Sequence, residues 1–268
     1  MRTASRTTRG FTLIELVVVI MISGIVATML TGFITRPIEG YDKLSKRATL
    51  VDIADTALRR IQRDVRRALP NSIRITGGGA TLELLHTIDG GRYRAGPAGD
   101  VLDFTAADTG FDVLGSLTNF AAIDLTSDQL VVYNLASSGT ANNAYFGDNR
   151  QTLTATGSNA NHLQLAAATQ FPLAAPNQRF FIVDTPVTFS CDLASGELRR
   201  YDGYPIASSQ PNPPGVTGAM LANRVSACNF SYQPGTATRS GLVQLSLELT
   251  ESGETIRLMH QVHVDNAS

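Results

Sequence analysis

The chain has few of the residues from which catalytic and metal sites are most often built. Its 268 residues include two cysteines and four histidines. The cysteines do not form a C-x-x-C pair, and the sequence contains no Gly-x-Ser-x-Gly nucleophile elbow. His260 and His263 are three residues apart, so on a strand they face opposite sides, and His86 and His162 lie in unrelated segments. The sequence therefore predicts no catalytic residue, no metal site and no cofactor, and it does not predict an enzyme.

The chain also lacks an excess of basic residues. Its formal net charge is −1. Residues 36–69 hold nine Lys or Arg and five Asp or Glu, whereas residues 70–268 hold ten and seventeen. Because a nucleic-acid surface needs a concentrated basic patch, the acidic C-terminal part argues against a nucleic-acid partner.

A loose acidic cluster allows two interpretations. It consists of Asp100, Asp103, Asp108 and Asp112. Calcium binds several oxygen ligands, but this spacing lacks the alternating frame of a calcium loop. Solvated turn residues are the favoured interpretation, and calcium binding stays open as the alternative.

Charge is nearly absent from a long apolar run near the N-terminus. Residues 11–34 carry one charged residue, Glu15. At about 1.5 Å per residue the run extends about 36 Å as a helix, which is enough to cross a bilayer. A carboxylate in such a helix costs about 2.5 kcal/mol or more near the bilayer centre and less near the interface. Glu15 is therefore predicted to have a role.

Two ordinary explanations of this run leave Glu15 unexplained. A secretory signal peptide has an apolar core of about 7–15 residues and a small-residue cleavage site. This run is longer, and its small residues do not form an Ala-x-Ala cleavage site. An uncleaved membrane anchor fits the length and stays open as an alternative.

The start of the run resembles a known family. Three arginines in residues 1–9 precede the sequence GFTLIE at residues 10–15. This combination is similar to the class III signal peptide of type IV pilins and type II secretion pseudopilins. The resemblance implies that prepilin peptidase cleaves after Gly10 and methylates the new amino terminus, Phe11. It also implies, as partners, the membrane, other major and minor pilins and the pilus assembly platform of the inner membrane.

The spacing of the junction suggests how Glu15 acts. Phe11 and Glu15 are four residues apart, which places them on one face of a helix. Cleavage after Gly10 would free the Phe11 amine. In a filament whose helices pack in an apolar core, the Glu15 carboxylate can pair with the amine of a neighbouring subunit, so that two costly charges neutralise each other. Glu15 is therefore predicted to act in assembly.

The pattern becomes amphipathic after the apolar run. Pro37 lacks an N–H group and is predicted to bend or break the helix. A stripe at three-or-four spacing then predicts the buried face: Ile38, Tyr41, Leu44, Ala48, Val51, Asp55, Leu58, Ile61 or Gln62, Val65 and Leu69. The arginines of residues 59–67 are predicted to form a solvated face with i,i+4 partners, and residues 69–71, Leu-Pro-Asn, are predicted to stop the helix.

Beyond residue 70 the signals are those of β-strands. Strands are predicted at residues 72–76, 80–85, 129–133, 179–184, 185–191, 198–201, 224–232, 241–250 and 255–264. Residues 77–79, Gly-Gly-Gly, are typical of a hairpin, and Pro186 suits an edge strand or a bend. Residues 136–161 have the composition of surface loops or short hairpins, and residues 208–218 have that of a loop.

Together these elements predict an α+β fold. A long N-terminal helix, with a membrane half and an amphipathic half, is expected to pack on a mainly antiparallel β head, as in pilins. The expected divisions are residues 1–10 as leader, 11–36 as transmembrane or filament-core helix, 37–69 as amphipathic stalk helix and 70–268 as globular head. The arginines of the leader favour a single-pass inner-membrane protein with its head in the periplasm. After assembly the chain is expected in a pilus filament, with the tip as one candidate position.

Cys191 and Cys228 both lie in the predicted head. In an oxidising periplasm such a pair is predicted to form a disulfide, and two buried free thiols are the alternative.

The head also resembles a family. Residues 69–75, 181–191, 196–201 and 221–232 are similar to the O-protein family of large minor prepilins in mannose-sensitive haemagglutinin (MSHA) pilus biogenesis. That family is akin to the J pseudopilins of type II secretion. The resemblance implies a minor prepilin that primes or caps an MSHA-like type IV pilus. A J-like minor pseudopilin and, from another class, an uncleaved membrane-anchored periplasmic binding or enzymatic domain stay open as alternatives.

Overall fold

The computed structural model describes residues 10–235, 239–264 and 266. The predicted leader therefore lies, apart from Gly10, outside the described residues. The chain divides into two compact units, Met1–Thr49 and Leu50–Ser268. Helix α1, Leu13–Arg66, contributes residues to both.

Helix α1 continues through Pro37, so the predicted break at that residue is wrong. Proline removes one N–H group from the i→i−4 ladder. More than five turns of helix precede Pro37 and more than seven follow it. The loss of one hydrogen bond does not end a helix that is supported on both sides.

Helix α1 ends at Arg66 rather than at the predicted Leu69, because the residues that follow pair with strand β2 (Thr81–Arg92). The Leu69 N–H donates to the Leu85 carbonyl (2.8 Å), and the Thr87 N–H donates to the Arg67 carbonyl (2.9 Å). A strand more than ten residues away in sequence therefore decides where the helix stops.

In the unit that begins at Leu50, α1 buries one face. The predicted stripe is confirmed at Leu58, Ile61 and Val65, which are fully buried. It is wrong at Val51, which is 41% exposed, because Leu50, Ala54 and Ala57 form the contact in that part of the helix. The small alanines allow the helix to lie close to the sheets. The upstream members of the stripe, Ile38, Tyr41 and Leu44, are exposed.

The glycine run forms the predicted hairpin turn. Strand β1 (Arg74–Thr76) pairs antiparallel with β2, and the 3-10 turn η1 (Gly77–Gly79) joins them. Gly79 has a φ of 97°, and a Cβ at this position would collide with the Asn229 side chain. Both constraints require glycine.

Strand β7 (Arg179–Asp192) is the central strand of the larger sheet, where the sequence predicted two strands, 179–184 and 185–191. One edge of β7 pairs with β2. The other edge pairs first with β4 (Gln129–Val132) and then with β8 (Glu197–Tyr201).

The sequence predicted an edge strand or a bend at Pro186, and the edge strand is wrong because β7 is central. The pairing of β7 explains why proline is tolerated there. Val183 is the last residue that pairs with β4, and Thr188 is the first that pairs with β8. Pro186 lies in the gap between these two partners, where no N–H donor is required.

The remaining strands complete three antiparallel sheets. Strands β5 (Arg150–Thr152) and β9 (Ala219–Ala222) join the seven-stranded sheet, and β3 (Asp108–Asp112) pairs with β6 (His162–Thr169). Strands β10 (Val225–Gln233), β11 (Gly241–Glu251) and β12 (Glu254–Val264) form the third sheet, and a short 3-10 helix, η2, spans Phe120–Ala122. Every strand pair among the described residues is antiparallel, and together with α1 these sheets confirm the predicted α+β class.

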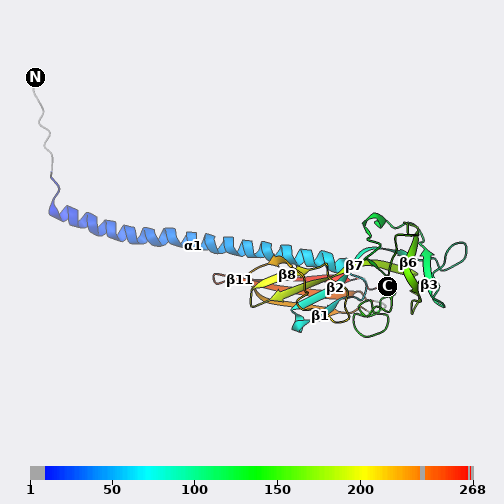
Figure 1. Ribbon diagram of the computed structural model, residues 1–268. Coiled ribbons are helices and arrows are strands. Elements are labelled where there is room, and N and C mark those ends of the chain that lie inside the picture. Colours follow the sequence, from blue (N-terminus) through cyan, green and yellow to red (C-terminus); the bar gives the residue numbers. More distant parts are fainter. Residues whose placement is uncertain (1–9, 236–238, 265, 267–268) are drawn as a thin grey trace, which may run out of the picture. The chain divides into compact units, whose positions relative to one another are not determined.

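Two main hydrophobic cores lie on this scaffold (Figure 1). The first lies between α1 and the sheets and includes Leu58, Phe189 of β7 and Leu247 of β11. The second lies around β3, β4 and β6, beyond the end of α1 (Figure 1). There the Phe111 and Phe180 rings pack edge to face, with their centroids 5.3 Å apart.

Cys191 of β7 and Cys228 of β10 form a disulfide, as predicted. The bond joins the seven-stranded sheet to the three-stranded sheet. It lies in the first core, where Cys191 is buried.

We expect the double variant Cys191→Ala/Cys228→Ala to lose about 4 kcal/mol of the free energy of unfolding, because the bond closes a loop of 37 residues. Denaturant titration of the full chain in detergent, under non-reducing conditions, measures the loss. Reductant should destabilise the wild type by a similar amount and leave the double variant unchanged. Equal midpoints for the oxidised wild type and the variant would contradict this expectation.

Candidate functional site

The predicted cleavage junction lies immediately before the first turn of α1. Gly10, Phe11 and Thr12 precede the helix, and the Phe11 side chain is 80% exposed. A Cβ added at Gly10 would meet no atom within 4 Å. The junction is accessible to another protein, and the fold supplies no reason for a glycine at this position.

Thr12 caps the helix. Its carbonyl accepts hydrogen bonds from the N–H groups of Glu15 (3.1 Å) and Leu16 (3.2 Å), and its hydroxyl oxygen lies 3.4 Å from the Glu15 nitrogen. Thr-x-x-Glu is the spacing of a capping box, and a carboxylate in the first turn is favoured by the helix dipole. Glu15 therefore places a favourable charge in the first turn of α1, a local feature that the sequence prediction left out although the spacing shows it.

The predicted position of Phe11 and Glu15 on one helical face is wrong for the described chain. The helix begins at Leu13, so Phe11 lies outside it. An N-cap residue has non-helical backbone angles, and the cap at Thr12 therefore ends the helical segment before Phe11.

The first part of α1 is long and apolar enough to cross a membrane. Residues Leu13–Leu30 have a mean hydropathy of 2.6, and none of them is buried within the structure. An exposed apolar surface of this size requires lipid or other protein to cover it. By length and composition, this helix fits an inner-membrane anchor.

The aspartates of the acidic cluster accept hydrogen bonds in turns. Asp112 accepts the Asp100 N–H (2.9 Å), Asp108 accepts the Asp103 N–H (2.8 Å), and Asp103 accepts both the N–H and the hydroxyl of Thr105 (2.7 Å each). The Thr105 hydroxyl and N–H lower the pKa of the Asp103 carboxyl. Across residues 10–235, 239–264 and 266, no group of three or more His, Cys, Asp or Glu side chains could hold a metal ion.

Three of the four histidines pair with separate aspartates: His86 with Asp184 (3.0 Å), His162 with Asp112 (3.0 Å) and His260 with Asp55 (3.5 Å). The hydrogen bond from His162 lowers the pKa of Asp112. Along β12, His260 is half-buried and His263 is exposed, which agrees with their predicted opposite faces. The structure therefore does not bring the histidines together into one centre.

Glu83 on β2 is a buried charge that the sequence pattern does not reveal. Its side chain is fully buried, and its Oε1 accepts a 2.8 Å hydrogen bond from Arg74, its register partner on β1. Burial raises the pKa of Glu83, and the Arg74 guanidinium opposes that rise. The guanidinium also stacks 3.7 Å above the Tyr145 ring centroid. This pair holds the β1–β2 hairpin to the loop around Tyr145.

One comparison with known proteins concerns the N-terminal segment. Residues 5–31 match the family model of the prokaryotic N-terminal methylation motif. No curated protein and no solved structure matches the chain. The matched residues include the predicted junction and Glu15, and the motif implies processing by prepilin peptidase and assembly with pilins in general. The N-terminal segment thus supports a type IV pilin-like or pseudopilin-like prepilin with a class III signal peptide, a group that is typically structural rather than enzymatic.

Proposed function

We propose that the chain is a minor prepilin, a structural or priming subunit of an MSHA-like type IV pilus. The observation that supports a prepilin is a methylation motif whose exposed junction leads directly into an unburied apolar helix. The resemblance of the head supports the minor, MSHA-like role. In the membrane, lipid covers this helix. In the filament, the apolar helices of other subunits replace the lipid.

The division of the chain follows from this function. Residues 1–10 are the leader, residues 11–36 the transmembrane and filament-core helix, residues 37–69 the stalk helix and residues 70–268 the periplasmic head. The head carries the disulfide, which suits an oxidising compartment.

Cleavage after Gly10 changes the charges at the start of α1. It frees the amine of Phe11, next to the Thr12 cap, where the helix dipole disfavours a positive charge. The Glu15 carboxylate of a neighbouring subunit relieves this cost and its own cost of burial at the same time. Glu15 therefore acts in assembly, and Phe11 is the residue that is methylated.

Two other functions remain distinguishable from this one. A J-like pseudopilin of type II secretion has the same kind of junction, and only the resemblance of the head favours the pilus. Finding the chain in pili sheared from the cell surface would favour the pilus. Loss of exoprotein secretion in its absence would favour the pseudopilin.

The alternative from another class is an uncleaved membrane-anchored periplasmic domain. Intact-mass and N-terminal peptide mass spectrometry separates it from a prepilin. We expect the chain from cells with active prepilin peptidase to begin at Phe11 and to carry one methyl group. Matched cells without the peptidase should retain Met1. An intact Met1 terminus in both kinds of cell would overturn the proposal.

A further inference from the structure

Two adjoining cavities meet at the end of α1, within the unit that begins at Leu50. Their volumes are about 560 and 550 Å³, and both are lined by Arg66 and Arg67. Arg63 lines the second cavity, and Arg92 and Arg179 line the first. These five arginines define the arginine groove.

Each aspartate that lines the groove has a partner within the same chain, and Asp202 pairs with Arg200. Asp64 accepts a hydrogen bond from Arg200 (2.7 Å), and Asp184 pairs with His86 (3.0 Å). Asp89 accepts the N–H groups of Gly90 and Asn119 (2.8 Å each).

The arginines of the last helical turns, in contrast, keep their charge available. Among the described residues, none forms an ion pair or hydrogen bond with the side chain of Arg63, Arg66 or Arg67. Two other arginines of the same helix do have i,i+4 partners. Arg59 pairs with Asp55 at 2.6 Å, and Arg60 lies 3.6 Å from Asp64. The predicted solvated face with helical partners therefore holds for Arg59 and Arg60. Arg63, Arg66 and Arg67 contribute the positive charge that the described residues do not pair.

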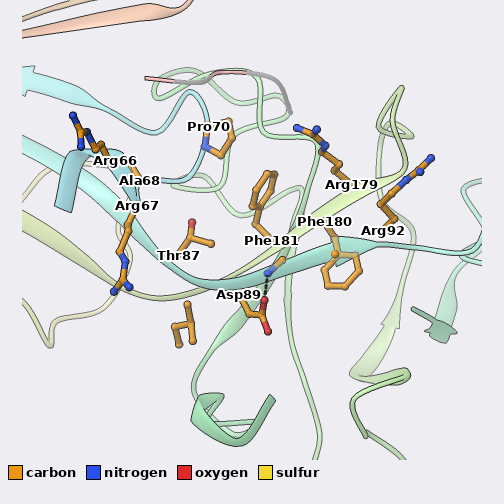
Figure 2. Close-up of a pocket in the computed structure, with 13 residues that line it drawn as sticks. Arg66, Arg67, Ala68, Pro70, Thr87, Asp89, Arg92, Arg179, Phe180 and Phe181 are labelled. Carbon is orange, nitrogen blue, oxygen red and sulfur yellow. Dashed lines mark hydrogen bonds between the residues drawn. The ribbon is translucent and has the colours of Figure 1, made fainter. Parts of the chain in front are cut away.

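The arrangement of the groove indicates the shape of its ligand. Figure 2 shows Arg66 and Arg67 on one side and Arg92 and Arg179 on the other, with Thr87 between them. The Thr87 hydroxyl oxygen is buried and has no hydrogen-bond partner among the described residues. Because the guanidinium groups flank the groove and do not converge on one point, it suits a polypeptide surface with separated carboxylates better than a single small anion.

The same chain carries exposed carboxylates in one segment. Residues 95–149, the acidic segment, contain seven aspartates and no lysine or arginine. Asp100, Asp103 and Asp124 are exposed. Hydrogen bonds from Thr105 and Thr126 lower the pKa of Asp103 and Asp124, respectively.

We propose that the arginine groove of one copy binds the acidic segment of a second copy of this chain. The two surfaces are different patches, so the contact is heterologous. Charge complementarity of this kind sets the register and partner choice of an interface. The inference goes beyond the proposed function, because it assigns a contact between heads where that function assigns one between helices.

Carbodiimide cross-linking tests this contact. Lysine occurs only at positions 43 and 46, so a new lysine gives a clear signal. The double variant Arg66→Lys/Arg67→Lys keeps the charge of the groove and adds amines that couple to nearby carboxylates. One batch of the full-length variant is labelled with heavy isotopes and a second batch is left unlabelled. The two batches are mixed in a non-ionic detergent and cross-linked. We expect mixed-isotope links from position 66 or 67 to peptides that contain Asp100 or Asp103, with a yield that falls as salt is raised.

Arg59→Lys is the matched control, because it lies on the same helix, is exposed and lines neither cavity. It should give at least about tenfold fewer such links. Same-isotope links alone, equal yields from the control, or no link to the acidic segment would overturn the proposal. The result does not depend on whether Gly10 is cleaved, so its failure is distinct from failure of the proposed function.

Discussion

Replacement of Gly10 by valine is expected to leave the chain uncut, with Met1 at its N-terminus, and Gly10→Ala is expected to be impaired in the same direction. We expect processing by prepilin peptidase to fall at least about tenfold, which corresponds to about 1.4 kcal/mol in the transition state. A Cβ at Gly10 would meet no atom within 4 Å, so the fold of the variant is unaffected. The loss therefore reports on the peptidase, whose cleft must accept the residue before the cut. Mass spectrometry of the membrane-bound chain gives the cleaved fraction.

Gly24→Ala is the matched control for this experiment. Gly24 also has open space beside its Cα, since a Cβ there would meet nothing within 4 Å. Gly24 lies within the apolar helix that follows the junction, away from the cleavage site. The control should be cleaved and methylated as the wild type is. Normal cleavage of Gly10→Val would show that the junction is not the processing site.

Replacement of Glu15 by glutamine is expected to leave cleavage and methylation intact and to reduce entry into filaments by about tenfold or more. Breaking a buried ion pair by removing one partner costs about 3–5 kcal/mol, because the remaining charge stays buried. In this case the remaining charge is the Phe11 amine of the neighbouring subunit. The measurement is the amount of the variant in filaments sheared from cells that express the variant and no wild-type chain.

The choice of glutamine separates the two roles of Glu15. Glutamine can replace glutamate in the capping box that Thr12 begins, so Glu15→Gln removes the charge and keeps the cap. Glu15→Ala removes the charge and the side chain that could complete the box, whereas the Thr12 hydroxyl still faces the backbone N–H of residue 15. We expect the two variants to lose filament entry to a similar extent. If Glu15→Gln enters filaments normally and Glu15→Ala does not, then the cap matters and the proposed ion pair is absent.

Elements with a strong local pattern were predictable from sequence. The strands at residues 129–133, 198–201, 224–232, 241–250 and 255–264 are found with ends that differ by a single residue. The alternation within β11 is visible in its burial, since Val243, Leu245, Leu247 and Leu249 are all buried. Strands β3, β5, β6 and β9 were not predicted. They are short or irregularly patterned, and their partners supply the order that their own residues do not.

The candidate site divides in the same way. The N-terminal junction is a contiguous signal, because its parts follow each other within residues 5–31. These parts are a basic leader, a glycine, an aromatic residue, a glutamate and an apolar run. The arginine groove is not contiguous, because Arg66 and Arg67 meet Arg179 only through the pairing of β2 with β7. From sequence these arginines are indistinguishable from a solvated helical face.

The chain's amino-acid order alone thus specifies the apolar helix, its charged first turn and the main hairpins, because backbone conformation at those places follows from side chains a few residues apart. The end of α1 at Arg66, the place of Pro186 in a central strand and the arginine groove depend on strands that pair across long stretches of chain. Such pairings are set by burial and hydrogen bonding between distant segments, and no local pattern encodes them.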